Sequence, residues 1–253
     1  MKRLLPLFPL FCTALLPAPV SAASCSAQRH WAPVVELYTS EGCSSCPPAD
    51  AWLGSLAAAA AAHRVVPLAF HVDYWNYIGW KDPYASADYS ARQRRLARAE
   101  GGTVVYTPQV RLAGEDFRGW SSADRVNERI ARGTPRASEP IDLLLDLGTR
   151  ELSVDARATL PADTVAYVAL YERRLASSVT RGENAGRRLE HDFVVRAYAG
   201  PFAVGRDGRL AVRHVFTPDA SWKREQLGVA LIQADADSGA ARLGVALPAS
   251  CDG

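Results

Sequence analysis

The apolar positions of the first half of the chain alternate between strand-like and helix-like spacing. A β-rich apolar run at 34–39 precedes a helix that begins at Pro47 and Pro48. Proline is tolerated there because the first N–H groups of a helix have no acceptor within the helix. A second strand-like run occupies 65–72. Since a helix links these two strands, we expect them to be parallel.

The same alternation continues with two further helices and a β-hairpin. One helix is predicted from Asp82, an N-cap residue, to the stop at Gly101. A strand at 104–112 and a short partner at 117–120 form the hairpin, and a last helix follows. The order β-α-β-α-β-β-α predicts an α/β domain over 31–133.

The apolar period changes to two beyond residues 134–140, a proline-containing stretch that we interpret as a linker. Isoleucine and leucine alternate with other residues over 141–147, and later strand-like runs are separated by turn signals such as Asp207-Gly208. The period of two and the turn signals therefore predict an antiparallel β-sandwich-like domain over 141–249.

Residues 1–22 have the pattern of a secretory signal peptide. Two basic residues precede an apolar run that contains four prolines and ends in a small-residue cleavage site at Ala22. We expect a periplasmic or secreted protein without a membrane span after cleavage. The composition of the whole 253-residue chain, 48% hydrophobic and 22% charged with a formal charge of +2, is typical of a globular protein and gives no reason to expect nucleic acid as a partner.

The chain contains five cysteines, at positions 12, 25, 43, 46 and 251. Signal cleavage removes Cys12 and leaves an even number in an oxidising compartment. We expect a structural disulfide between Cys25 and Cys251, because free thiols are disfavoured outside the cell and chain ends often lie close together. Two alternatives stay open, namely unrelated terminal thiols and lipid attachment at Cys25.

Cys43 and Cys46 are separated by two residues at the predicted junction of a strand and a helix. The helix N-terminus stabilises a thiolate there and lowers the pKa of the first cysteine. This arrangement predicts Cys43 as the nucleophile and Cys46 as the thiol that resolves the mixed disulfide. The alternatives are a permanent disulfide or half of a zinc site, but zinc usually needs a second cysteine pair or closely spaced histidines, so no metal is expected.

A Thr107-Pro108 dipeptide lies inside the predicted strand at 104–112. Proline cannot donate a hydrogen bond to a β-ladder, so it belongs at a special backbone position, and a cis peptide bond is one such position. With the cysteine pair, the chain here resembles the thioredoxin superfamily. The resemblance implies a cis Pro108 beside Cys43 and a substrate-binding role for Thr107 and Pro108.

Three segments are similar to a narrower family of exported bacterial proteins that is known only as a domain of unknown function. They are VVELYTSEGCSSCPP at 34–48, HVDYWNYIGWKDP at 71–83 and RGENAGRRLEH at 181–191. That resemblance implies a thioredoxin-like first half and a β-rich second half, and it carries no established reaction. It also suggests that the loop at 181–191 closes over the first half through Glu183, Asn184 and His191.

His71 and Asp73 follow the second predicted strand, at the sheet edge where the cysteine pair is expected. They are candidates for proton transfer to Cys46 or for metal ligation with the thiolates, and Glu36 is a further accessory candidate. The alternative is that these polar residues only cap a strand end.

These observations predict an exported thiol–disulfide oxidoreductase, or a redox partner in such a pathway, that acts on protein thiols and disulfides without a cofactor. Two other functions stay open. The thiolates suit Cu(I), which would make the chain a copper-binding or chaperone protein. Alternatively, the cysteines form a structural disulfide in a non-catalytic binding module.

Overall fold

The computed structural model describes residues 23–135, 141–148 and 150–248, with side chains from residue 30 onward. The predicted signal peptide at 1–22, most of the predicted linker and Cys251 lie outside the described residues, as does the side chain of Cys25. Export, the fate of Cys25 and its pairing with Cys251 therefore stay predictions.

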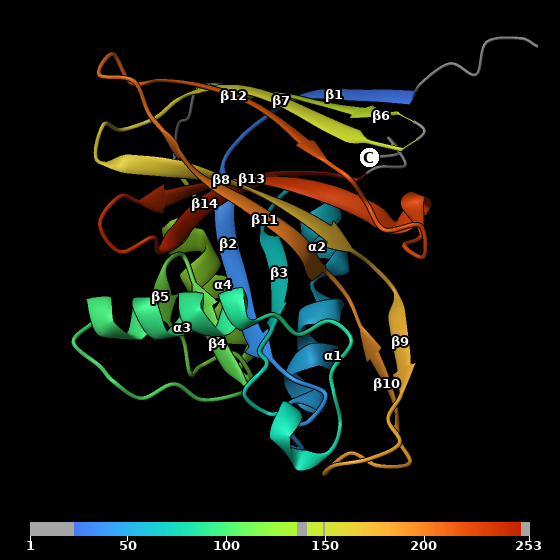
Figure 1. Ribbon diagram of the computed structural model, residues 1–253. Helices are drawn as coiled ribbons and strands as arrows, with labels where there is room; N and C mark the ends of the chain where they lie inside the picture. The colour runs from blue at the N-terminus through green and yellow to red at the C-terminus, as the bar shows by residue number, and fades with distance from the viewer. Residues whose placement is uncertain (1–22, 136–140, 149, 249–253) are drawn as a thin grey trace, which may run out of the picture.

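A closed six-stranded β-barrel forms the centre of the molecule (Figure 1). Its strands, in order around the barrel, are β14 (Ala241–Pro248), β13 (Leu227–Asp235), β8 (Thr164–Glu172), β11 (Val194–Ala203), β3 (Val66–His71) and β2 (Ala32–Thr39). Antiparallel pairing of β14 with β2 closes it. Strands β4 (Gln109–Leu112) and β5 (Glu115–Asp116) extend the sheet beyond β2.

A second sheet lies across one side of the barrel as a separate layer (Figure 1). Its strands are β1 (Ala23–Arg29), β6 (Ile141–Leu147), β7 (Leu152–Thr159) and β12 (Arg209–Phe216). The alternating apolar residues of β6 and β7 are buried against side chains of β8, β13 and β14 in one hydrophobic core. The period-two pattern thus places one face of each strand in this core.

The helices gather on the other side of the molecule from the second sheet (Figure 1). They are α1 (Pro47–Ser55), α2 (Ala57–Ala61), α3 (Ala87–Ala99), α4 (Ala123–Gly133) and the short 3-10 helix η1 (Asn76–Ile78). A second 3-10 helix, η2 (Arg224–Gln226), lies apart from them: it directly precedes β13, and Arg224 donates a hydrogen bond to the carbonyl oxygen of Gly148 beside the second sheet. No helix in the described part of the chain is long and apolar enough to cross a membrane.

The predicted α/β thioredoxin-like domain followed by a β-sandwich-like domain is wrong. The structure is mostly β, with 42% strand and 21% helix, and its central element is the closed barrel. Local features are confirmed, because β2 and β3 are parallel and α1 begins at Pro47. The error arose because β11 and β14, which come from the distant second half, occupy the free edges of β3 and β2.

The barrel takes strands from both 31–133 and 141–249. The predicted domain boundaries stay a prediction, but the strands of the two segments share one sheet.

The helix predicted from Asp82 begins later, at Ala87, with Ser86 as its N-cap. The Ser86 hydroxyl accepts a hydrogen bond from the N–H of Asp88 at 3.2 Å. Asp82 does not cap this helix, because its carboxyl group accepts hydrogen bonds from the main-chain N–H groups of Glu41 and Tyr84, each at 2.9 Å.

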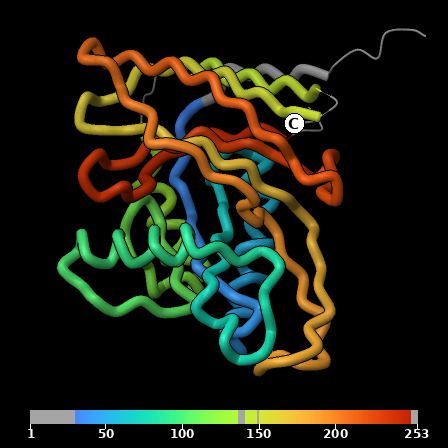
Figure 2. The backbone as a smooth tube through the Cα atoms, viewed as in Figure 1, coloured from blue at the N-terminus to red at the C-terminus, as the bar shows by residue number. Residues whose placement is uncertain are grey.

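A long hairpin leaves the barrel and runs along α1 (Figure 2). It consists of β9 (Leu175–Ser178), β10 (Arg188–His191) and the loop between them. We call residues 175–191 the strap. It brings the segment at 181–191 from the second half of the sequence to the first turn of α1 and the loop after β3.

Candidate functional site

Cys43 and Cys46 form a disulfide in the loop between β2 and α1, with their Cα atoms 5.4 Å apart. Both are buried, with exposed fractions of 1% and 0%, whereas Ser44 and Ser45 between them are exposed. Cys46 is the N-cap of α1, and its carbonyl oxygen accepts the first hydrogen bonds of the helix. The pair thus lies where the sequence places it, but beneath the surface.

The two prolines that open α1 limit the interactions of this helix with sulfur. Pro47 and Pro48 have no N–H, so two groups that would face a thiolate at a helix N-terminus are missing. The hydroxyl of Ser45 lies 3.4 Å from the sulfur of Cys43. Stabilisation of a thiolate by α1 therefore depends on the helix dipole, with Ser45 as a local polar partner.

The strap is hydrogen-bonded to the main chain of the cysteine loop. The carboxylate of Glu183 accepts a hydrogen bond from the N–H of Ser44 at 3.0 Å. The side-chain amide of Asn184, which is completely buried, donates to the carbonyl oxygens of Glu41 at 2.9 Å and Cys43 at 3.0 Å. The predicted closure of this loop through its polar residues is confirmed by these contacts.

Thr107 and Pro108 lie near the cysteine loop, joined to it by Trp75. The Thr107–Pro108 peptide bond is cis, as the resemblance to the thioredoxin superfamily implied. The indole N–H of Trp75 donates to the hydroxyl of Thr107 at 2.8 Å. Trp75 also packs so closely on Gly42 that a Cβ atom at that glycine would lie 2.9 Å from the tryptophan Cβ. Gly42 thus permits the close approach of the two segments.

Asp116 anchors the residues on either side of the Thr107–Pro108 bond. Its carboxylate accepts hydrogen bonds from the hydroxyl of Tyr106 at 2.7 Å and from the amide of Gln109 at 3.0 Å. Partial burial raises the pKa of Asp116, but these hydrogen bonds outweigh it and hold the pKa below its ordinary value of 3.8.

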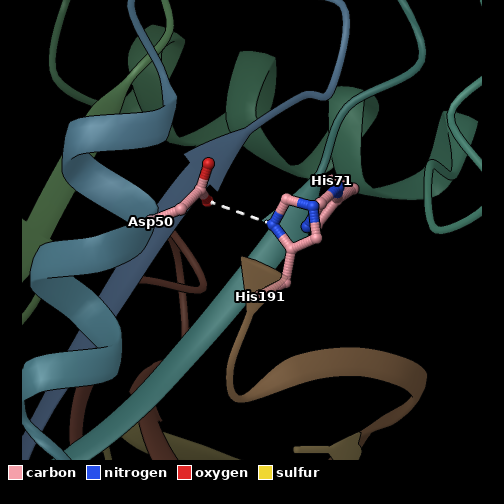
Figure 3. Close-up of side chains that lie close together, drawn as sticks. All are labelled: Asp50, His71 and His191. Carbon is pink, nitrogen blue, oxygen red and sulfur yellow. Dashed lines mark ion pairs between the residues drawn. The ribbon is translucent and has the colours of Figure 1, made fainter. Parts of the chain in front are cut away.

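Two buried histidines meet beside α1 (Figure 3). His71 ends β3 and His191 ends β10, and their ring centroids are 4.8 Å apart. Nδ1 of His71 lies 2.7 Å from a carboxylate oxygen of Asp82, and Nε2 of His191 lies 3.1 Å from one of Glu41. Each imidazole is therefore held by one carboxyl group.

Asp50 of α1 faces His191 from the opposite side (Figure 3). Its Oδ1 lies 3.8 Å from Nδ1 of His191, which is an ion-pair distance but too long for a hydrogen bond. Burial lowers the pKa of His191, but the carboxyl groups of Asp50 and Glu41 outweigh it and raise the pKa to about 10. The two carboxyl groups therefore favour the protonated form of this buried imidazole.

The other accessory candidates do not join this cluster. Asp73 pairs with the hydroxyl of Ser90 on α3. Glu36 is buried, and its Oε1 lies 2.8 Å from a guanidinium nitrogen of Arg92. The two groups form an ion pair, but their geometry does not meet the criteria for a hydrogen bond. Arg92 in turn lies over aromatic rings of the core, so this pair is a feature of the interior and not of the cysteine site.

Sequence reasoning missed Glu41, Asp50 and Asp82 as members of the site. Asp50 follows Cys46 by one helical turn, a spacing that places both on one side of α1 and that could have drawn attention to it. Glu41 and Asp82 lie far apart in the sequence. The strap and the loop after β3 bring them to the two histidines.

Comparison with known families matches residues 34–233, well over half of the chain, to DUF1223, described as a protein of unknown function. A crystal structure of a protein from Agrobacterium tumefaciens is similar, with 28% sequence identity and a TM-score of 0.62 over 87% of this chain and 95% of that chain. No curated protein matches the chain. The expected membership in a family of unknown function is confirmed: the chain belongs to the DUF1223 family.

Proposed function

We propose that the protein is a thiol–disulfide exchange protein whose reacting pair is Cys43 and Cys46. The observation that carries this proposal is the disulfide between two cysteines three residues apart at the start of α1. Such a pair closes a very small loop, so it contributes little cross-linking to the fold compared with a disulfide between distant residues. A role in chemistry accounts for the pair better than a role in stability.

The exchange proceeds through a mixed disulfide. A substrate thiolate attacks the sulfur of Cys43, the Cys43–Cys46 bond breaks, and Cys46 leaves as a thiolate. A second substrate thiolate then attacks the substrate sulfur of the mixed disulfide and releases Cys43 as a thiolate. The substrate dithiol is oxidised to a disulfide and the cysteine pair is reduced. The same steps in reverse reduce a substrate disulfide.

Two neighbouring features support this role. Thr107 and Pro108 are linked to the cysteine loop through Trp75, so their backbone is available to align an extended substrate segment. The strap lies over the disulfide through Glu183 and Asn184, so exchange with a protein substrate requires that the strap move. We therefore propose that movement of the strap controls the access of a substrate to the disulfide.

The decisive experiment is a trapping assay with single cysteine variants. Cys46→Ser should accumulate a mixed disulfide between Cys43 and its substrate protein, because the resolving thiol is absent, whereas Cys43→Ser should accumulate none. Mass spectrometry of the trapped species identifies the linked cysteine. If neither variant forms an adduct with a protein substrate or with a small disulfide, the exchange function is wrong.

A second function is favoured by the burial of both cysteines. With exposed fractions of 1% and 0%, the disulfide also fits a structural role in a binding module. That function predicts a strongly reducing midpoint potential and no adduct in either variant. Measuring the midpoint potential together with the trap therefore separates the two functions.

A further inference from the structure

The histidine cluster contains two buried ring nitrogens without hydrogen-bond partners. Nε2 of His71 and Nδ1 of His191 have none among the described residues, although the other nitrogen of each ring is bonded to a carboxyl group. The side chains of the two histidines are 0% and 1% exposed. A buried polar nitrogen without a partner is costly, so a pair of them facing one space calls for a ligand.

Asp50 supplies a third atom to the same space. Its Oδ2 accepts a hydrogen bond from the hydroxyl of Thr39 at 3.1 Å, while its Oδ1 points toward His191 (Figure 3). One ligand atom from each of Asp50, His71 and His191 lies within 4.8 Å of the others. Three elements, α1, β3 and β10, hold these atoms together in the closed arrangement of the strap.

We propose that Asp50, His71 and His191 form a binding site for a divalent transition-metal ion of the zinc type. The ligand atoms are Oδ1 of Asp50, Nε2 of His71 and Nδ1 of His191. The proposal goes beyond thiol–disulfide exchange and does not depend on it, because neither cysteine is a ligand.

The hydrogen bonds around the three side chains fit this role. Histidines that bind metal commonly donate their other N–H to a carboxylate, which fixes the ring orientation and makes the free nitrogen a better ligand. Asp82 does this for His71, and Glu41 does it for His191. The outer partners of all three ligands, including Thr39 for Asp50, are thus already present.

The charges of the cluster also favour a cation. Three carboxyl groups, those of Glu41, Asp50 and Asp82, face only two imidazoles. Within the described residues these carboxyl groups form ion pairs with the two histidines alone, and no lysine or arginine takes part. A dication bound between the histidines and Asp50 balances this group of acids.

The spacing requires only small side-chain movements. Zinc binds nitrogen and oxygen ligands at about 2.0–2.2 Å, so tetrahedral ligand atoms lie roughly 3.4 Å apart. The present separations, at most 4.8 Å, therefore contract by about 1.4 Å or less when the ion binds. Two histidines and one carboxylate leave a fourth position for water or another ligand.

Tyr84 marks a route by which an ion reaches the cluster. Its ring packs against His71 and His191, with centroid separations of 5.3 and 5.6 Å. The same tyrosine lines a cavity of about 770 Å³ together with Arg196 and Trp222. Tyr84 therefore contacts both the two histidines and this cavity, which makes its half-buried side chain the candidate gate for an entering ion.

The test uses the full chain with its disulfide intact, stripped of metal with a chelator and titrated with Co²⁺ and then Zn²⁺. We expect one Co²⁺ per chain, a visible absorption band typical of four-coordinate cobalt with nitrogen and oxygen ligands, and loss of that band when Zn²⁺ displaces it. His71→Gln and Asp50→Asn should each weaken binding by about 100-fold or more, and Asp82→Asn by about 10–100-fold.

Two control variants make the result specific. His214→Gln changes a histidine on β12 whose ring packs against Phe202 and Phe216, outside the cluster, and it should bind Co²⁺ as the unchanged protein does. Cys43→Ser combined with Cys46→Ser should also retain the site, which separates this proposal from the redox function. No bound Co²⁺ at millimolar concentration in the unchanged protein would overturn the proposal. Equal affinity in correctly folded His71→Gln, checked by circular dichroism, would overturn it as well.

Discussion

Asn184 ties the strap to the cysteine loop through two buried hydrogen bonds. Its side-chain amide donates two hydrogen bonds to main-chain oxygens on either side of Gly42, and its own oxygen accepts one from Arg187. Replacing it with alanine removes both bonds to the cysteine loop and leaves the length of the strap unchanged. We expect Asn184→Ala to open the strap and speed reduction of the Cys43–Cys46 disulfide.

The size of the effect follows from the two hydrogen bonds to the loop. A buried hydrogen bond contributes a net of about 0.5–1.5 kcal/mol, so the two together stabilise closure by about 1–3 kcal/mol. Since about 1.4 kcal/mol changes an equilibrium tenfold, the open population should rise roughly 5- to 150-fold. The contact of Glu183 with Ser44 is exposed to solvent and is left out of this sum.

The assay measures how fast a phosphine reductant opens the disulfide of the oxidised protein. Samples are quenched at intervals, and free thiols are alkylated and counted by mass spectrometry. If the strap opens and closes faster than reduction occurs, the observed rate is proportional to the open population. The rate for Asn184→Ala should then exceed that of the unchanged protein by the factor given above. Asn184→Asp, which keeps the side-chain size but loses the donor, should behave similarly.

Glu190→Gln is the matched control, because Glu190 lies on the same strap but is exposed and forms its ion pair with Arg188 of the strap itself. Its reduction rate should stay within about twofold of the unchanged protein, as for an ordinary surface substitution. An unchanged rate in correctly folded Asn184→Ala would refute the conclusion that the strap limits access to the disulfide.

Three further predictions concern stability and can be checked by denaturant titration. Gly42→Ala places a methyl group 2.9 Å from Cβ of Trp75 and should lower the free energy of unfolding by about 1–3 kcal/mol. The control is Gly54→Ala in α1, where the nearest atom to the new methyl group would be 3.7 Å away, so this change should be neutral or stabilising. Glu36→Gln leaves Arg92 buried without its counter-charge and should cost about 3–5 kcal/mol, and a loss below 1 kcal/mol would contradict this account of the pair. Asp116 has a lowered pKa, so the stability from its hydrogen bonds is present above about pH 4 and is lost as the pH falls through that lowered pKa. Asp116→Asn should flatten this part of the pH profile, and an unchanged profile would argue against it.

The sequence predicted local elements of the fold better than their assembly. The parallel pair β2 and β3 and the proline start of α1 follow from spacing and backbone chemistry, and both are found. The closed barrel was not foreseen, because periodicity identifies a strand without identifying its partner. Val194 of β11 pairs with β3, and Leu243 of β14 pairs with β2, across more than a hundred residues of sequence.

The candidate site was predicted in part for the same reason. Cys43, Cys46 and the cis Pro108 were identified because each carries a local signal, and the strap was identified through a resemblance. The histidine cluster was not predicted as a set: His71 and His191 were each singled out for separate reasons, and Asp50 was not singled out. Asp50, His71 and His191 lie far apart in the sequence and show none of the short spacings typical of zinc ligands, so only their three-dimensional arrangement brings out their common environment.

The strap contributes a residue to each of the two sites, so we expect their states to be thermodynamically linked. Asn184 binds the cysteine loop and His191 belongs to the proposed metal site, so opening the strap withdraws a metal ligand as it uncovers the disulfide. A metal that binds only the closed form lowers the open population by a factor of one plus the metal concentration divided by its Kd. Zn²⁺ at a hundred times its Kd should therefore slow reduction of the disulfide about 100-fold. The His71→Gln variant should lose this protection while keeping its metal-free rate. Equal slowing of both proteins would show that zinc acts elsewhere and that the two sites are independent.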